Sequence, residues 1–121
     1  EQCTFDDVHG AGIWITCDSE VDHESIATRD VTIRDNLFRR TSPAISASAG
    51  RKQTYPDIHE NLLIDGNRIE AAPRAAIDLK SVKSGLVRNN TIEAAGDEPI
   101  KLSLSSGVRV ENNRVTRWAK P

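Results

Sequence analysis

The segments "VTIRDNLF" (31–38), "LLIDGNRI" (62–69), "GLVRNNTI" (85–92) and "VRVENNRV" (108–115) align with one another and decide the fold. Each contains an apolar residue, an asparagine three positions later and a second apolar residue two positions after that. The asparagines are spaced 31, 23 and 23 residues apart and are Asn36, Asn67, Asn90 and Asn113. A repeat of this length predicts a solenoid in which each repeat forms one coil. "EQCTF" (1–5) fits the end of the same frame, with Cys3 at the asparagine position.

A second kind of segment follows each of these after seven or eight residues: "GIWIT" (12–16), "AISAS" (44–48), "AIDLK" (76–80) and "PIKLS" (99–103). Apolar and polar residues alternate in both kinds of segment, which is the period of a half-buried strand. The apolar residues of the second kind form two columns, Ile13, Ile45, Ile77 and Ile100, and Ile15, Ala47, Leu79 and Leu102. Parallel coils stacked about 4.8 Å apart would bury both columns. We therefore predict an all-β fold, a right-handed single-stranded parallel β-helix of four to five coils that forms one domain over residues 1–121.

The asparagine position has a physical reason of its own. Asparagine tolerates left-handed backbone geometry, and its amide both donates and accepts hydrogen bonds. Stacked asparagines can therefore satisfy one another from coil to coil, and we predict an asparagine ladder at this corner. The alternative is that these residues only mark solvent-exposed turns.

Composition limits the class of protein. The chain is 37% hydrophobic and 28% charged with a net charge of −2, which is typical of a globular domain. A nucleic-acid-binding face would be basic, and no apolar run approaches the roughly 18 residues of a membrane span. The three histidines, His9, His23 and His59, have no metal-ligand spacing. We expect no cofactor, no metal, no nucleic acid partner and no membrane span.

Two insertions lengthen the early coils, "CDSEVDHESIATRD" (17–30) and "AGRKQTYPDIHEN" (49–61). Both follow a segment of the second kind, so we expect them to leave the stack at one corner as adjacent loops. Loops on a rigid scaffold commonly carry binding residues. Function is therefore expected in the N-terminal half of the chain.

Side chains that alternate with the inward columns should face outward. The outward column is Trp14, Ser46, Asp78 and Lys101, and Lys80 belongs to the next column. An aromatic ring flanked by hydroxyl and charged groups is typical of a sugar-binding face, because the ring stacks on the apolar face of a pyranose. The alternative is an ordinary solvated sheet on which Asp78 and Lys101 form a cross-strand ion pair.

The first insertion is rich in carboxylates, including Asp18 and Glu24. Paired carboxylates could serve as acid and base in glycoside hydrolysis or could hold calcium. A solvated acidic loop is the alternative. Asp18, Glu24 and His59 complete the candidate substrate-binding residues.

The run "GIWITCDSEVDHESIATRDVTIRDNLF" (12–38) resembles the later β-helix coils of glycoside hydrolase family 110, the α-1,3-galactosidases. Two further blocks, "YPDIHENLLIDGNRI" (55–69) and "KSVKSGLVRNNTI" (80–92), resemble the same family, and the resemblance spans about three quarters of the chain. His23 and Ile26 depart from the family pattern. "DDVHG" (6–10) is similar to the family's catalytic double-aspartate motif but lies too early in the turn, so no catalytic role is transferred to it.

The resemblance implies a C-terminal fragment of a secreted, periplasmic or cell-surface β-helix protein. Its parent would be a glycoside hydrolase that acts on α-galactosides. This piece would supply scaffold and part of a carbohydrate-binding cleft, would contact upstream coils of the same chain and would be inactive alone, with the catalytic residues upstream of residue 1. Two alternatives stay open. One is a non-catalytic carbohydrate-binding or surface module, and the other is a polysaccharide lyase that uses Lys80 or Lys101 as the base.

We predict that Cys3 and Cys17 are not joined by a disulfide. Cys3 lies at the asparagine corner and Cys17 follows a strand of the second kind, whereas a disulfide needs Cα atoms within roughly 7 Å. Thiol titration of the denatured chain without reductant should therefore detect both cysteines. Loss of both thiols in monomeric protein would contradict the prediction.

Overall fold

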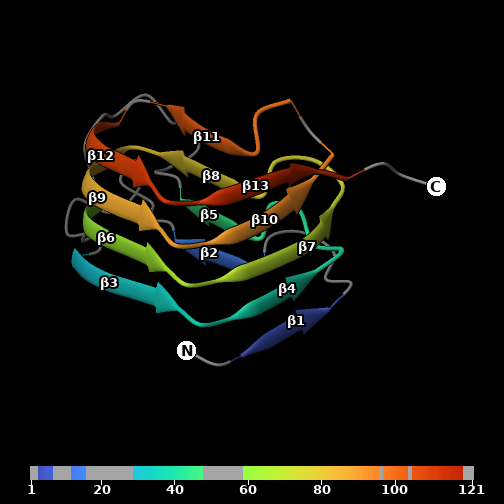
Figure 1. Cartoon of the computed structure of the whole chain (residues 1–121). Helices are drawn as coiled ribbons and strands as arrows, with labels where there is room; N and C mark the ends of the chain where they lie inside the picture. The colour runs from blue at the N-terminus through green and yellow to red at the C-terminus, as the bar shows by residue number, and fades with distance from the viewer. Residues whose placement is uncertain are drawn as a thin grey trace, which may run out of the picture.

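The computed structural model describes residues 3–6, 12–15, 29–47, 59–95, 97–103 and 105–118. Within these ranges the chain forms thirteen β-strands and no helix. Figure 1 shows the strands stacked in successive coils, with β1 at one end of the stack and β11 to β13 at the other. The predicted parallel β-helix is confirmed, because every coil lays its strands beside those of the next coil in three separate sheets.

Each sheet collects one strand from successive coils, and all neighbouring strands are parallel. Sheet A contains β1 (Thr4–Asp6), β4 (Leu37–Arg39), β7 (Arg68–Ala72), β10 (Thr91–Ala94) and β13 (Arg114–Arg117). Sheet B contains β2 (Ile13–Ile15), β5 (Ile45–Ala47), β8 (Ile77–Lys80) and β11 (Ile100–Ser103). Sheet C contains β3 (Arg29–Arg34), β6 (His59–Asp65), β9 (Val82–Arg88) and β12 (Ser106–Glu111).

The core is a set of apolar columns that run through the stack. On sheet B, Ile45 and Ile77 pair in register and have no exposed surface. Ile13 and Ile100 extend this column by one strand on either side, as predicted. Leu102 of the neighbouring column is 42% exposed, because it belongs to the last coil and is covered from one side only. Since burying an aliphatic side chain contributes about 1.5–3 kcal/mol, the middle coils contribute most of the stability.

The first segment of the chain joins the same frame. Phe5 of β1 pairs with Phe38 of β4, and the two rings stack with their centroids 4.9 Å apart. The backbone N–H of Cys3 donates to Oδ1 of Asn36 at 3.0 Å. Cys3 therefore occupies the asparagine position, as predicted. Cys17 lies outside the described residues, so the absence of a disulfide stays a prediction.

The side chains of Asn36, Asn67, Asn90 and Asn113 form a hydrogen-bonded asparagine column from coil to coil. Each Nδ2 donates to Oδ1 of the next asparagine, at 3.1, 3.0 and 2.9 Å in order along the chain. The same Oδ1 atoms accept a backbone N–H from the preceding coil at 3.1, 2.8 and 3.0 Å. In the last three asparagines, Nδ2 also donates to a backbone carbonyl, that of Ile33, Ile64 and Val87 respectively. The column thus satisfies buried backbone groups as well as its own amides.

The left-handed backbone at this corner belongs to the residue before each asparagine. These residues have φ values of 55° to 68° and are Asp35, Gly66, Asn89 and Asn112. The asparagines of the column do not themselves adopt the left-handed backbone, because that conformation falls one position earlier. Aspartate, glycine and asparagine are the residue types that adopt this conformation at the lowest cost. At this corner the residue before each asparagine turns the chain, and the asparagine itself hydrogen-bonds to the neighbouring coil.

The corner between sheets B and C differs from coil to coil. Between β8 and β9 it is a single residue, Ser81, with φ of 63°. In the two earlier coils the predicted insertions separate the strands at this corner, between Ile15 and Arg29 and between Ala47 and His59. The flanking strands pair in register, so the strand ends that the two insertions connect lie at the same corner, as predicted. The course of the insertions themselves lies outside the described residues. Strands β3 and β6 begin one or two residues before the predicted ends of the insertions.

Replacing Asn90 with alanine should destabilise the fold by about 1–3 kcal/mol, because it leaves buried amide and carbonyl groups without partners. Asn113→Ala is the matched control, since Asn113 is only partly buried and water can replace the lost partners. Urea denaturation of both variants measures the difference. If both variants lost the same free energy of unfolding, or if the midpoint of Asn90→Ala were unchanged, the contribution of the column to stability would not depend on burial.

Candidate functional site

The outward side chains of sheet B form one column across four strands. Trp14 pairs in register with Ser46, Ser46 with Asp78, and Asp78 with Lys101. We call these four residues the sheet B strip. Parallel strands lie about 4.8 Å apart, so the strip is roughly 14 Å long. The structure therefore brings together four of the residues that the sequence suggested as ligand contacts.

Trp14 gives the strip its apolar surface. Its side chain is 64% exposed, the largest value among the exposed large hydrophobic residues of the described ranges. The flanking residues on β2 are Ile13 and Ile15, and Ile15 is buried, so the tryptophan stands on a fixed strand. An exposed indole offers a flat apolar face with one polar N–H at its edge, a combination that suits a ligand with both apolar and polar surfaces.

Asp78 is the unusual group of the strip. Its Oδ1 is buried, and among the described residues this atom accepts no hydrogen bond. The described ranges also contain no ion pair between Asp78 and Lys101, so the alternative of a cross-strand pair on a solvated face is not what the structure has. Buried polar atoms without a partner are rare in folded proteins and often mark a functional position.

The other predicted site residues lie in different places. Lys80 ends β8 in register with Ser103, one column away from the strip. His59 begins β6 on sheet C and is 1% exposed, so its side chain lies in the interior and not on the strip. Asp18 and Glu24 fall outside the described residues.

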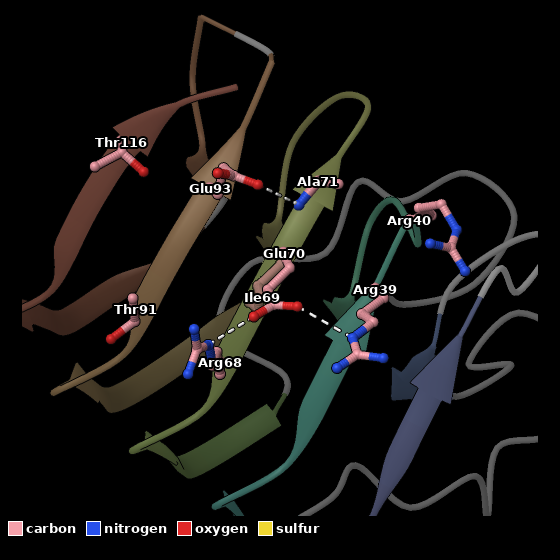
Figure 2. Close-up of a pocket in the computed structure, with 9 residues that line it drawn as sticks. All are labelled: Arg39, Arg40, Arg68, Ile69, Glu70, Ala71, Thr91, Glu93 and Thr116. Carbon is pink, nitrogen blue, oxygen red and sulfur yellow. Dashed lines mark hydrogen bonds and ion pairs between the residues drawn. The ribbon is translucent and has the colours of Figure 1, made fainter. Parts of the chain in front are cut away.

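The structure also contains a polar pocket that the sequence analysis did not predict. It lies on the outward face of sheet A and has a volume of about 270 Å³. Figure 2 shows its lining residues, which come from four strands and the turn after β4, and they are Arg39, Arg40, Arg68, Ile69, Glu70, Ala71, Thr91, Glu93 and Thr116. We call it the sheet A pocket. Its centre is Glu70, which bridges Arg39 of β4 and Arg68 of β7.

The same alternation that identified the sheet B strip would have found this pocket. Phe38 and Ile69 face inward in register on sheet A, so Arg39 and Glu70 must face outward together. Tryptophan and serine are the residue types that suggest sugar binding on sheet B, and the outward face of sheet A has neither in this pocket. Which charges pair with which could not be predicted, since it depends on the choice among several neighbouring arginines.

The described residues contain no group of three or more histidine, cysteine, aspartate or glutamate side chains that could hold a metal ion. They also contain no helix that is long and apolar enough to cross a membrane.

Comparison with known families agrees with this geometry. The model of the family described as "Right handed beta helix region" matches residues 1–120. The chain belongs to this right-handed β-helix family. The strip and the pocket are therefore outward faces of a right-handed β-helix. No solved structure matches the chain.

One curated protein similar to this β-helix chain is alpha-1,3-galactosidase A from Streptomyces avermitilis. The two are 28% identical over an alignment of 120 residues that covers 90% of this chain. The chain spans 19% of the length of that relative, so the comparison concerns one part of a much longer protein.

Replacing Asp78 with asparagine should raise the free energy of unfolding by about 0.5–1 kcal/mol, because the variant removes a charge whose buried oxygen has no partner. The control is Asp65→Asn, since Asp65 accepts hydrogen bonds from Arg88 at 3.4 Å and Asn89 at 3.2 Å. That variant should be neutral or slightly destabilised. Thermal and urea unfolding measure both, and a destabilised Asp78→Asn variant would contradict the expectation.

Proposed function

We propose that this chain is the scaffold and part of the glycan-binding surface of a secreted carbohydrate-active protein, a glycoside hydrolase that acts on α-galactosides. The observation that carries the proposal is the sheet B strip, in which an exposed indole stands in one column with the side chains of Ser46, Asp78 and Lys101. The similarity to an α-1,3-galactosidase supports the choice of α-galactosides.

The strip has the chemistry that sugar recognition requires. The face of Trp14 can stack on the apolar face of a pyranose ring. Asp78 can accept hydrogen bonds from sugar hydroxyls, and the hydroxyl of Ser46 can donate or accept them. Lys101 adds a donor at the far end. A strip of roughly 14 Å is long enough for more than one sugar ring.

Catalysis is proposed to lie elsewhere in the parent protein. Glycoside hydrolysis generally uses a pair of carboxyl groups that flank the scissile bond. The described part of the strip has one carboxylate, Asp78. We therefore propose that this segment is one piece of a longer β-helix and that the catalytic pair lies outside the described residues. The chain alone should bind an α-galactoside without hydrolysing it.

Trp14→Ala should weaken the affinity of the full chain for α-1,3-linked galactobiose about tenfold, since loss of the indole removes about 1.4 kcal/mol of stacking and burial. Trp14→Phe should retain most of the affinity because the ring face remains. Thr32→Ala, an outward residue of sheet C, is the control and should bind normally. Isothermal titration calorimetry measures all three variants.

Three outcomes would contradict the proposal. Unchanged affinity in Trp14→Ala would remove the strip from the binding surface and leave the segment as scaffold. Cleavage of a uronic acid polymer with formation of an unsaturated product would favour a polysaccharide lyase instead. Binding without turnover, both in the chain and in the whole parent protein, would favour the non-catalytic module.

A further inference from the structure

We propose that the sheet A pocket is a second saccharide site, specific for a sugar that carries a negative charge, with Arg39 and Arg68 as the residues that hold the anionic group. The inference rests on the proposed function only in taking a glycan as the ligand. The anionic group is a uronic acid carboxylate or a sulfate ester, and both can present two acceptor oxygens to one guanidinium group.

Glu70 holds the two arginines in a fixed arrangement. Its Oε1 lies 3.1 Å from Nε of Arg39, and its Oε2 lies 2.7 Å from Nε of Arg68. Figure 2 shows the two guanidinium groups on either side of this carboxylate. Because Glu70 uses both oxygens, each arginine is held by the inner nitrogen of its guanidinium group. The side chains are therefore positioned before any ligand arrives, which lowers the entropy that binding must overcome.

The outer nitrogens of both guanidinium groups remain available. Among the residues that the structure describes, the Nη atoms of Arg39 and Arg68 have no hydrogen-bond partner. The side chains of Arg39 and Arg68 are 46% and 68% exposed, so a ligand can reach them. A guanidinium group presents its donors as a planar fork that matches two acceptor oxygens, as in a carboxylate or a sulfate.

The charges around the pocket favour an anion. Three arginines line it, against two glutamates, Glu70 and Glu93. Arg40 is paired with Asp6, so the charges available to a ligand are those of Arg39 and Arg68. Glu70 is shared by two arginines, and Oε1 of Glu93 accepts the backbone N–H of Ala71 at 3.0 Å. Ala71 has φ of 55° at an irregularity in the pairing of β7 with β10, so Glu93 is committed to stabilising this bend. The carboxylates of the pocket are thus engaged, whereas the outer guanidinium nitrogens of Arg39 and Arg68 have no partner among the described residues.

The size and the remaining lining suit a sugar. The volume of about 270 Å³ lies just below the range of about 300–1,000 Å³ that is usual for ligand pockets, so a single ring is the appropriate size. Thr91 and Thr116 line the side of the pocket away from Arg39, and their hydroxyls can bond to sugar hydroxyls. A ring that places its anionic group at Arg39 and Arg68 would therefore meet hydroxyl groups at its other edge.

The experiment compares binding of two anionic probes and one neutral probe to the full chain by calorimetry. The probes are trigalacturonate, a sulfated galactose oligosaccharide and α-1,3-linked galactobiose. Arg39→Gln and Arg68→Gln should each weaken binding of the anionic probe about fivefold, and raising NaCl from about 0.05 M to about 0.5 M should weaken it further. Arg109→Gln is the matched control, because Arg109 is an exposed arginine of sheet C that pairs with Glu111 and loses the same charge.

The probe whose binding is weakened by both Arg39→Gln and Arg68→Gln identifies the source of the anionic group. If only trigalacturonate binds more weakly to the two variants, the ligand carries a carboxylate. If only the sulfated probe binds more weakly, the ligand carries a sulfate ester. Equal losses in Arg109→Gln, or no loss in the two pocket variants with either probe, would overturn the inference. Failure of the proposed function is distinguishable, because Trp14→Ala should affect only the neutral probe and the pocket variants only the anionic ones. Thermal midpoints of all variants show that folding is retained.

Discussion

The structure depends on keeping successive coils in one register, and the asparagine column is the interaction that does so where the chain turns. Each Oδ1 accepts both a side-chain and a backbone N–H from the preceding coil, so a shifted coil would lose several buried hydrogen bonds at once. A shift by one residue would also turn Ile45 and Ile77 outward. Because the register is fixed, the outward side chains must form columns, and both candidate sites are such columns.

The repeat made most of the fold predictable. The spacing of Asn67, Asn90 and Asn113, with the alternation of apolar residues, was enough to assign the coils, the inward columns and the members of the sheet B strip. Which residue turns left-handed could not be assigned from the repeat, because several residue types tolerate that backbone. The pocket around Glu70 was missed, because the pairing of charged side chains on an open sheet depends on side-chain geometry that alternation does not determine. The lack of a partner for Asp78 Oδ1 could likewise be seen only in the structure.

The two candidate sites differ in how the scaffold prepares them. On sheet B, an exposed indole lies in one column with Asp78, whose buried Oδ1 accepts no hydrogen bond from the residues that the structure describes. On sheet A, the fold satisfies the inner atoms of the arginines and leaves the outer ones for a ligand. Both sites lie on strands of a rigid stack and not on mobile elements, which favours specificity for shape and charge over adaptability. The neutral and anionic parts of one branched glycan, or two separate chains, could occupy them.

The central claim is that the outward column of sheet B is a glycan-binding surface. Its most direct test is a nuclear magnetic resonance titration of the labelled chain with α-1,3-linked galactobiose. The account predicts that the largest shift changes occur at the indole N–H of Trp14 and at the amides of Ser46, Asp78 and Lys101, with little change on sheet C. Changes confined to sheets A or C, or no saturable change anywhere, would contradict it.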